Sequence, residues 1–141
     1  MELEVNDRLE PRCALVKYFP GGSPDLFEEC IAAGYRGIVL EGTGLGHVAS
    51  DWVGSIKAAT DAGVPVVITS QCLRGRVCDR VYDTGRDILA AGGIEGGDIL
   101  PEVALVKLMW ALANTGSVDE AEAVMKISLA GEISASTPTT V

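Results

Sequence analysis

The alternation of short β-branched runs with longer amphipathic stretches is the feature that most constrains what this chain can fold into. Segments rich in Val, Ile and Leu predict strands over 12–19, 35–42 and 64–70. Helical periodicity separates them over 25–34 and 50–63, and each of these stretches ends on a glycine that suits a helix stop. This order implies right-handed crossovers and a parallel sheet. We therefore expect an α/β fold whose third strand, with its unbroken apolar content, is buried on both faces.

Beyond residue 70 the pattern becomes irregular. A short fourth strand is expected over 76–78, and helices are expected over 85–93, 100–116 and 117–131. The residues expected at helix starts are Ser23 with Pro24, Ser50, Asp83 or Thr84, Pro101, and Ser117 with Glu120. The last pair has the spacing of a capping box. Together with the first three strands, these elements predict a small parallel sheet of three or four strands flanked by helices.

Length and charge limit the classes of function. With 141 residues the chain is expected to form one domain. Its formal net charge of −9 opposes a phosphate backbone, so no direct nucleic-acid binding is expected. Arg74, Arg76 and Arg80 form one basic cluster, which we interpret as solvated loop charge, with an anion or partner contact as the alternative. The first residues lack the basic and apolar regions of a secretory signal, and the apolar runs fall short of a bilayer span. A soluble, cytoplasmic protein is expected.

Cysteine and histidine content argues against a metal centre. The four cysteines, Cys13, Cys30, Cys72 and Cys78, have no C-x-x-C spacing, and the chain has a single histidine. We expect reduced, mostly buried thiols. No metal or cofactor is expected.

The stretch "GIVLEGTGLGHVASDW", residues 37–52, carries Gly42, Gly44 and Gly46 just before His47. It leaves the second predicted strand and enters a helix, and ligands in open parallel sheets bind at the carboxyl ends of the strands. Its spacing, G-x-G-x-G, differs from the dinucleotide fingerprint G-x-G-x-x-G, and no Walker pattern is present, so a phosphate cradle has weak support. The alternative is that the glycines only permit a tight strand-to-helix turn. Composition does not choose between a site and a turn.

Two patterns in the chain match catalytic motifs only in part. "DTG" at 83–85 occurs in aspartic proteases, but here it begins a helix instead of belonging to an all-β arrangement, so capping explains it better. A Ser-His-Asp triad would need His47, yet the chain has no G-x-S-x-G elbow. We therefore assign no catalytic residue to this chain.

Six segments in order carry a family resemblance: "ALVKYFPG", "GYRGIVLEGTGLGHV", "VVITSQCLRGRV", "YDTGRDILAAGGI", "GGDILPEVALVKLMWALANT" and "LAGEI". Over residues 12–133 they resemble the carboxy-terminal domain of the asparaginase/glutaminase family, and most of all the branch of archaeal glutamyl-tRNA(Gln) amidotransferase D subunits. Type I L-asparaginases are close relatives of that branch. The resemblance implies a three-layer, Rossmann-like or flavodoxin-like domain, with residues 1–11 as the remnant of an interdomain linker. The small, polar segment 134–141 is expected to be a flexible tail.

The resemblance also implies where the chemistry takes place. In this family the catalytic threonines lie in a larger amino-terminal domain, whose motifs this chain lacks. A threonine hydroxyl there would attack the glutamine amide, form an acyl-enzyme and release ammonia. This chain is not expected to be active alone, and its implied role is to complete the amide pocket and a dimer interface. The implied partners are the amino-terminal asparaginase domain, a second copy of the same protein, the E subunit of the amidotransferase, and glutamine or asparagine.

The same resemblance assigns a role to the glycine turn. In asparaginases the matching turn reaches the active site of a neighbouring protomer and holds the amino end of the substrate, which here implies Gly44, Leu45, Gly46 and His47. Leu45 and His47 stand where the family commonly has Asn, which puts asparagine-type contacts in doubt. His47 is expected either to face the pocket or to be a structural imidazole hydrogen-bonded within the turn.

A second implied site is the end of the third strand, which lines an effector pocket in bacterial type I asparaginases. The matching residues are Thr69, Ser70 and Cys72, with a small buried cysteine as the alternative interpretation. A domain of a type I L-asparaginase, a stand-alone amino-acid-binding module and a purely structural assembly domain also stay open. The large side chains of Trp52, Leu108 and Trp110 are expected in the core rather than on a partner surface.

Overall fold

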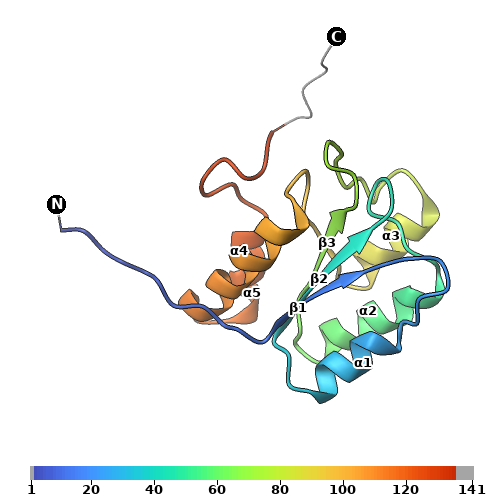
Figure 1. The fold of residues 1–141 in the computed structure, drawn as a ribbon, viewed down its shortest axis with the longest axis horizontal. Helices are drawn as coiled ribbons and strands as arrows, with labels where there is room; N and C mark the ends of the chain where they lie inside the picture. Colours follow the sequence, from blue (N-terminus) through green and yellow to red (C-terminus); the bar gives the residue numbers. More distant parts are fainter. Residues whose placement is uncertain (1, 136–141) are drawn as a thin grey trace, which may run out of the picture.

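The computed structural model describes residues 2–135, which form one sheet with helices on both faces (Figure 1). The strands in this part of the chain are β1 (Cys13–Lys17), β2 (Gly37–Gly42), β3 (Val66–Ser70) and β4 (Ile94–Glu95). The helices are α1 (Asp25–Ala32), α2 (Asp51–Asp61), α3 (Asp83–Ala90), α4 (Pro101–Asn114) and α5 (Val118–Met125). All strand pairs are parallel and the sheet order is β1-β2-β3-β4. The predicted α/β fold with a small parallel sheet is confirmed.

Alternate side chains of the central strands enter two separate cores. Ile38 and Leu40 of β2 point with Ile68 of β3 toward α1, α2 and α3. Val39 and Val67, which are register partners, point to the opposite face, where α4 and α5 pack. All five residues of β3 are buried, as predicted for a strand covered on both sides.

The three crossover helices lie on one face because each new strand is added on the same side of the previous one. Trp52 of α2 is buried in this layer, with its ring edge-on to Phe27 at 6.0 Å and to Tyr18 at 5.3 Å between ring centroids. On the other face Leu108 of α4 is fully buried. A Cβ at Gly37 would lie 2.8 Å from a methyl carbon of Leu108, so this glycine lets α4 approach β2. Trp52 and Leu108 are core residues, as expected.

Trp110 was expected in the core but is only half-buried, and it contacts the segment that precedes β1. Its indole N–H donates to the backbone carbonyl oxygen of Asn6 at 2.8 Å. The side-chain amide of Asn114 donates to the backbone carbonyl oxygen of Arg8, also at 2.8 Å. This segment therefore lies along α4 (Figure 1). Of the expected flexible tail 134–141, residues 136–141 lie outside the described residues, and Ser134 donates its backbone N–H to an Asp98 carboxylate oxygen at 2.8 Å.

The fourth strand was predicted in the wrong place. Residues 76–78 are not a strand, although the N–H of Val77 makes one backbone hydrogen bond to Gly97 at 2.9 Å. The edge of β3 pairs instead with Ile94–Glu95, with Val67 opposite Ile94. A two-residue strand between glycines is too short for any alternating pattern, and this is why the sequence does not reveal it.

Helix ends follow the predictions in some places and not in others. Ser117 caps α5, because its hydroxyl oxygen accepts the N–H of Glu120 at 3.2 Å, and Pro101 begins α4. Ser50 occupies the N-cap of α2 but makes no capping bond. The N-cap of α3 is Tyr82, so the predicted caps Asp83 and Thr84 are wrong.

Two further details of the first and last helices differ from the predictions. At α1 the N-cap is Pro24, and the hydroxyl of Ser23 accepts the N–H of Asp25 at 3.2 Å. The last helix ends at Met125, where the sequence predicted a helix to 131, because Lys107 and Glu132 hold the following residues in a loop. No helix in the described residues is both long and apolar enough to cross a bilayer.

The thiols are less buried than expected. Cys13, Cys30 and Cys78 are half-buried, and Cys72 is exposed, which excludes the interpretation of Cys72 as a buried core residue. All four are unpaired. Burial raises the pKa of Cys13 to about 11, with Glu10 adding to the effect.

Candidate functional site

The glycine turn closes on itself at the carboxyl end of β2. Thr43 and His47 exchange two backbone hydrogen bonds of 2.9 Å, forming an isolated antiparallel bridge directly after the strand. The N–H of Gly46 also donates to Thr43 at 2.9 Å. Thr43 and Gly44 are exposed at the tip. The turn is therefore a small, hydrogen-bonded hairpin.

The three glycines of the turn meet different steric demands. A Cβ at Gly42 would lie 2.5 Å from the carbonyl carbon and oxygen of Gly46, so the backbone itself comes too close for a side chain. Gly46 has φ +96°, and a Cβ there would lie 3.0 Å from Val77 and 3.1 Å from Ile68. Gly44 has φ +53° with open space around it. Two of the glycines thus allow the turn to close, whatever it binds.

The last residue of β3 and residues that follow it hold the turn in place. The hydroxyl of Ser70 donates to the carbonyl oxygen of Gly44 and accepts the N–H of Cys72 at 3.0 Å. The N–H of Gln71 donates to Gly42 at 2.8 Å, and the N–H of Cys78 donates to Leu45 at 3.0 Å. The carbonyl oxygens of Gly42, Gly44 and Leu45 are thus all bonded to donors outside the turn.

Gln71 also joins the ends of the first two strands. Its side-chain amide donates to the carbonyl oxygens of Tyr18 at 2.6 Å and Glu41 at 3.2 Å. The carboxylate of Glu41 pairs with Lys17 of β1 at 3.2 Å. The carboxyl edge of the sheet is thus cross-linked from β1 to β3. Sequence reasoning did not single out Gln71, because its role depends on strands that are distant in the chain.

His47 is half-buried at the base of the turn. Its ring is edge-on to Tyr82, with centroids 5.1 Å apart and planes at 81°, and Tyr82 is exposed. The Nε2 atom of His47 is buried and has no hydrogen-bond partner among residues 2–135. The imidazole therefore has one buried ring nitrogen without a partner and lies edge-on to an exposed aromatic ring.

The residues assigned to an effector pocket differ in exposure. Thr69 is fully buried, and its hydroxyl donates to the carbonyl oxygen of Leu40 at 3.1 Å within the sheet. Ser70 is buried and bonded to the turn, whereas Cys72 is exposed. Of these three side chains, only that of Cys72 faces solvent.

The basic cluster beside the turn is not uniformly solvated. Arg74 and Arg80 are exposed, as interpreted from the sequence. Arg76 instead donates to the carbonyl oxygen of Ser134 and lies 3.6 Å from the Asp98 carboxylate. The acid within the cluster, Asp79, is fully buried. Sequence reasoning missed this burial because Asp79 stands between charged and small residues.

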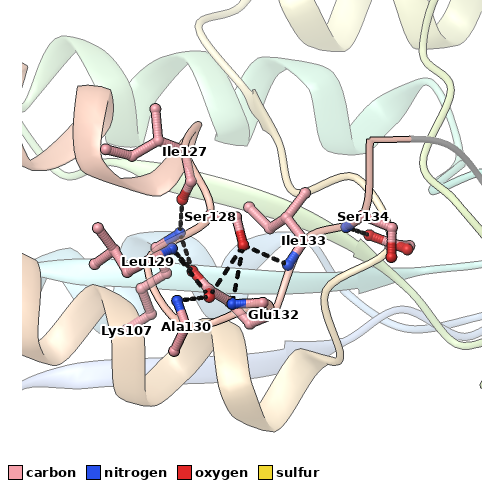
Figure 2. Close-up of polar contacts among 10 residues, drawn as sticks. Lys107, Ile127, Ser128, Leu129, Ala130, Glu132, Ile133 and Ser134 are labelled. Carbon is pink, nitrogen blue, oxygen red and sulfur yellow. Dashed lines mark hydrogen bonds and ion pairs between the residues drawn. The ribbon is translucent and has the colours of Figure 1, made fainter.

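A second surface feature is a groove of about 560 Å³ along α4. Its walls include Leu9, Val106, Trp110 and Leu129, and Lys107 and Glu132 also line it. Figure 2 shows how these last two side chains anchor the segment 127–134. The ammonium of Lys107 donates to the carbonyl oxygen of Ile127 and lies 2.7 Å from the Glu132 carboxylate.

The Glu132 carboxylate also accepts the backbone N–H groups of Leu129 and Ala130 (Figure 2). Burial alone would raise the pKa of Glu132, but the Lys107 hydrogen bond and these two N–H groups more than offset it and hold the pKa well below its usual range. The segment 127–134 is therefore organised around one largely buried carboxylate, that of Glu132.

Residues 12–125 match the Glutaminase/Asparaginase C-terminal domain family. The chain belongs to this family. It is 58% identical over 131 residues to the D subunit of the glutamyl-tRNA(Gln) amidotransferase of Methanosarcina barkeri, and 59% identical over 136 residues to that of Archaeoglobus fulgidus. These alignments cover 93% and 96% of this chain but 31% and 32% of the relatives. The chain therefore spans about a third of the length of these relatives.

Solved asparaginases share the fold of this C-terminal domain. The thermostable L-asparaginase from Thermococcus kodakarensis superposes with a TM-score of 0.83 at 36% identity, covering 92% of this chain and 40% of that one. L-asparaginase I from Vibrio cholerae gives 0.84 at 32% identity, covering 95% and 41%. The resemblance seen in the sequence is confirmed at the level of family and fold.

Proposed function

We propose that this chain acts as the C-terminal domain of a glutaminase subunit of the kind found in archaeal Glu-tRNA(Gln) amidotransferases. The observation that carries the proposal is the 58% identity with an amidotransferase D subunit over 93% of the chain. Identity with the solved L-asparaginases is 36% and 32%, which makes a type I L-asparaginase domain the second candidate. We therefore expect glutamine to be the amide that the whole enzyme hydrolyses, with asparagine as the second candidate.

The glycine turn is the part of this domain that we propose contacts the substrate. Gly44, Leu45, Gly46 and His47 would complete an amide pocket whose nucleophile lies in another domain. The turn is exposed at its tip, and Ser70 holds the tip in place through the carbonyl oxygen of Gly44, which suits a positioning role. Holding a substrate in a fixed orientation lowers the barrier without bond chemistry by the positioning group. The Nε2 atom of His47 has no hydrogen-bond partner within residues 2–135, so the imidazole would be the polar group available to a ligand once this buried atom is uncovered.

The proposal extends to the partners and surroundings of the domain. Residues 1–11 would be an interdomain linker that joins an amino-terminal asparaginase domain. A second copy of the same protein would share the pocket, and the E subunit of the amidotransferase would receive the ammonia, all in the cytoplasm. The end of β3 would be an effector site through Cys72, the member of the assigned set that is exposed. The net charge of −9 favours leaving tRNA contacts to the partner protein.

A fusion to the missing part of a relative tests the proposal. The chain would replace the matching third of the Methanosarcina barkeri D subunit, and ammonia release from glutamine and asparagine would be measured. We expect the fusion to hydrolyse glutamine and the isolated chain to hydrolyse neither amide. Turnover of glutamine by the purified chain alone would refute the assignment.

Variants of the same fusion test the turn. We expect His47→Ala to raise the KM for glutamine by up to about tenfold, the equivalent of one lost hydrogen bond. Asp61→Asn, at an exposed position at the far end of α2, is the control and should leave KM unchanged. An unchanged KM in His47→Ala would leave a purely structural domain as the better interpretation.

Calorimetry of the isolated chain with glutamine, asparagine and aspartate tests the alternative of a stand-alone binding module, which would bind one of them at micromolar affinity.

A further inference from the structure

Asp79 is the one acidic side chain among the described residues that is fully buried. Both of its carboxylate oxygens lie out of contact with solvent and have no hydrogen-bond partner within residues 2–135. Its backbone N–H donates to the carboxylate of Glu95 at 3.0 Å. A buried polar group without a partner costs about 1–3 kcal/mol even when neutral, and far more when it is charged. The site therefore strongly favours the protonated acid.

The backbone around Asp79 leaves it little room to escape this environment. A Cβ at Gly85 of α3 would lie 2.4 Å from the carbonyl oxygen of Asp79, so α3 is pressed against this residue. The two preceding residues are also held. The N–H of Val77 is bonded to Gly97, and the N–H of Cys78 is bonded to Leu45 of the glycine turn. Relief for an ionised Asp79 would require this segment to move.

Charges near Asp79 add to the cost of ionisation. Burial raises the pKa of Asp79, and the neighbouring carboxylate of Glu95 in β4 raises it further, to about 7. Arg80 lies 3.8 Å from the other carboxylate oxygen of Glu95 and is largely exposed. On α3, the carboxylate of Asp83 pairs with Arg86.

We propose that Asp79 acts as a pH-dependent latch. The segment 76–82 stays packed against the glycine turn while the Asp79 carboxyl is neutral, and the segment loosens when this carboxyl ionises. Three contacts would transmit the change to the turn. Val77 packs where a side chain at Gly46 would stand, Cys78 is bonded to Leu45, and Tyr82 covers His47. The inference concerns the conformation of the turn and holds whatever the turn binds.

The sign of the pH dependence follows from proton linkage. The folded pKa of Asp79 lies above its ordinary value of 3.8, so the latched state binds more protons than the open state between those two values. Latching is therefore strongest at low pH, weakens as pH rises from about 4 to about 7, and is constant above that range. Between about pH 5.5 and about pH 8.5 the opening equilibrium should increase by about 30-fold.

Amide hydrogen exchange on the full chain measures this opening. We expect the protection factors of the Val77 and Cys78 amides, corrected for intrinsic exchange, to fall by about 30-fold over that pH interval. A carbon-detected NMR titration should give Asp79 a midpoint near 7. Protection that is independent of pH, or a midpoint near 4, would overturn the proposal.

Variants separate the latch from general effects of pH. Asp79→Asn and Asp79→Leu both remove the ionisation, so in either variant that folds the two protection factors should no longer depend on pH. Asp87→Asn, on the exposed side of α3, should keep the wild-type response. Glu95→Gln should lower the Asp79 midpoint, because the neighbouring negative charge is removed. A wild-type pH response in Asp79→Leu would assign the effect to another group.

Discussion

The closest approach in the glycine turn is between two parts of its own backbone. Gly42 and Gly46 meet where any Cβ would collide, and Ser70 then fastens the tip. A motif that looks like a ligand cradle in the sequence is thus first a requirement for chain closure. Thr43 and Gly44 are the residues of the closed turn that remain exposed.

Replacing Gly46 tests this closure directly. Gly46→Ala should lower the free energy of unfolding by about 2–4 kcal/mol, because φ of +96° disfavours a side chain and Val77 and Ile68 would have to shift to admit one. Gly54→Ala is the matched control. Gly54 lies in α2 with open space around it, so that change should stabilise the chain by about 0.5–1 kcal/mol. Urea unfolding measures the change in the free energy of unfolding in both variants. Equal changes in the two variants would contradict the steric account.

At the scale of residues the sequence predicted where the site candidate lies but not how it is built. The spacing of glycines beside His47 was visible in the sequence. The burial of Asp79 was not, because it results from Gly85 and Glu95, which are brought in by α3 and β4. Long-range packing of this kind leaves no local pattern for periodicity to detect.

At the scale of elements, α2 and α5 form a natural pair for comparing caps. Both begin after a serine, but only Ser117 accepts a hydrogen bond from its helix. Ser117→Ala should therefore cost about 1 kcal/mol of unfolding free energy, and Ser50→Ala close to nothing. Denaturant midpoints measure the difference. A larger loss in Ser50→Ala than in Ser117→Ala would show that cap geometry does not control these helix ends.

The segment after α5 depends on Glu132, which predicts a dependence on acid. The folded pKa of Glu132 lies below its ordinary value of 4.5, so its stabilisation is present above that pH and is lost as pH falls below it. Glu132→Gln should cost about 1–3 kcal/mol at neutral pH, from the loss of charged hydrogen bonds. The gap between variant and wild type should narrow below about pH 4.5. Glu4→Gln, at an exposed position, is the control.

Elements were predictable in proportion to their length. The three strands predicted from segments rich in Val, Ile and Leu lie where the pattern placed them, within a few residues, and so do the starts of the five helices. β4 has two residues and was missed, and 76–78 was wrongly assigned because Val77 serves as a packing residue beneath Gly46. The loop after Met125 was taken for helix because its long-range partner, Lys107, lies on another helix.

For the molecule as a whole, the net charge of −9 predicts a response to salt. Repulsion among like charges opposes the compact state, and mobile ions screen it. The free energy of unfolding at neutral pH should rise by about 1 kcal/mol between about 0.05 M and about 0.5 M NaCl. Near pH 4.5, the isoelectric point expected from the sequence, the effect should disappear. Stability that falls with salt at neutral pH would point to the described ion pairs as the stronger influence.

The strand order β1-β2-β3-β4 limits what the carboxyl edge can enclose. In open α/β sheets a ligand crevice arises where the order of strands reverses, since neighbouring crossovers then leave on opposite faces and part from each other. Here the crossovers through α1, α2 and α3 all leave on one face (Figure 1). The carboxyl edge of this sheet is therefore open and does not enclose a ligand by itself. A closed pocket above it would need its remaining walls from a different region of polypeptide.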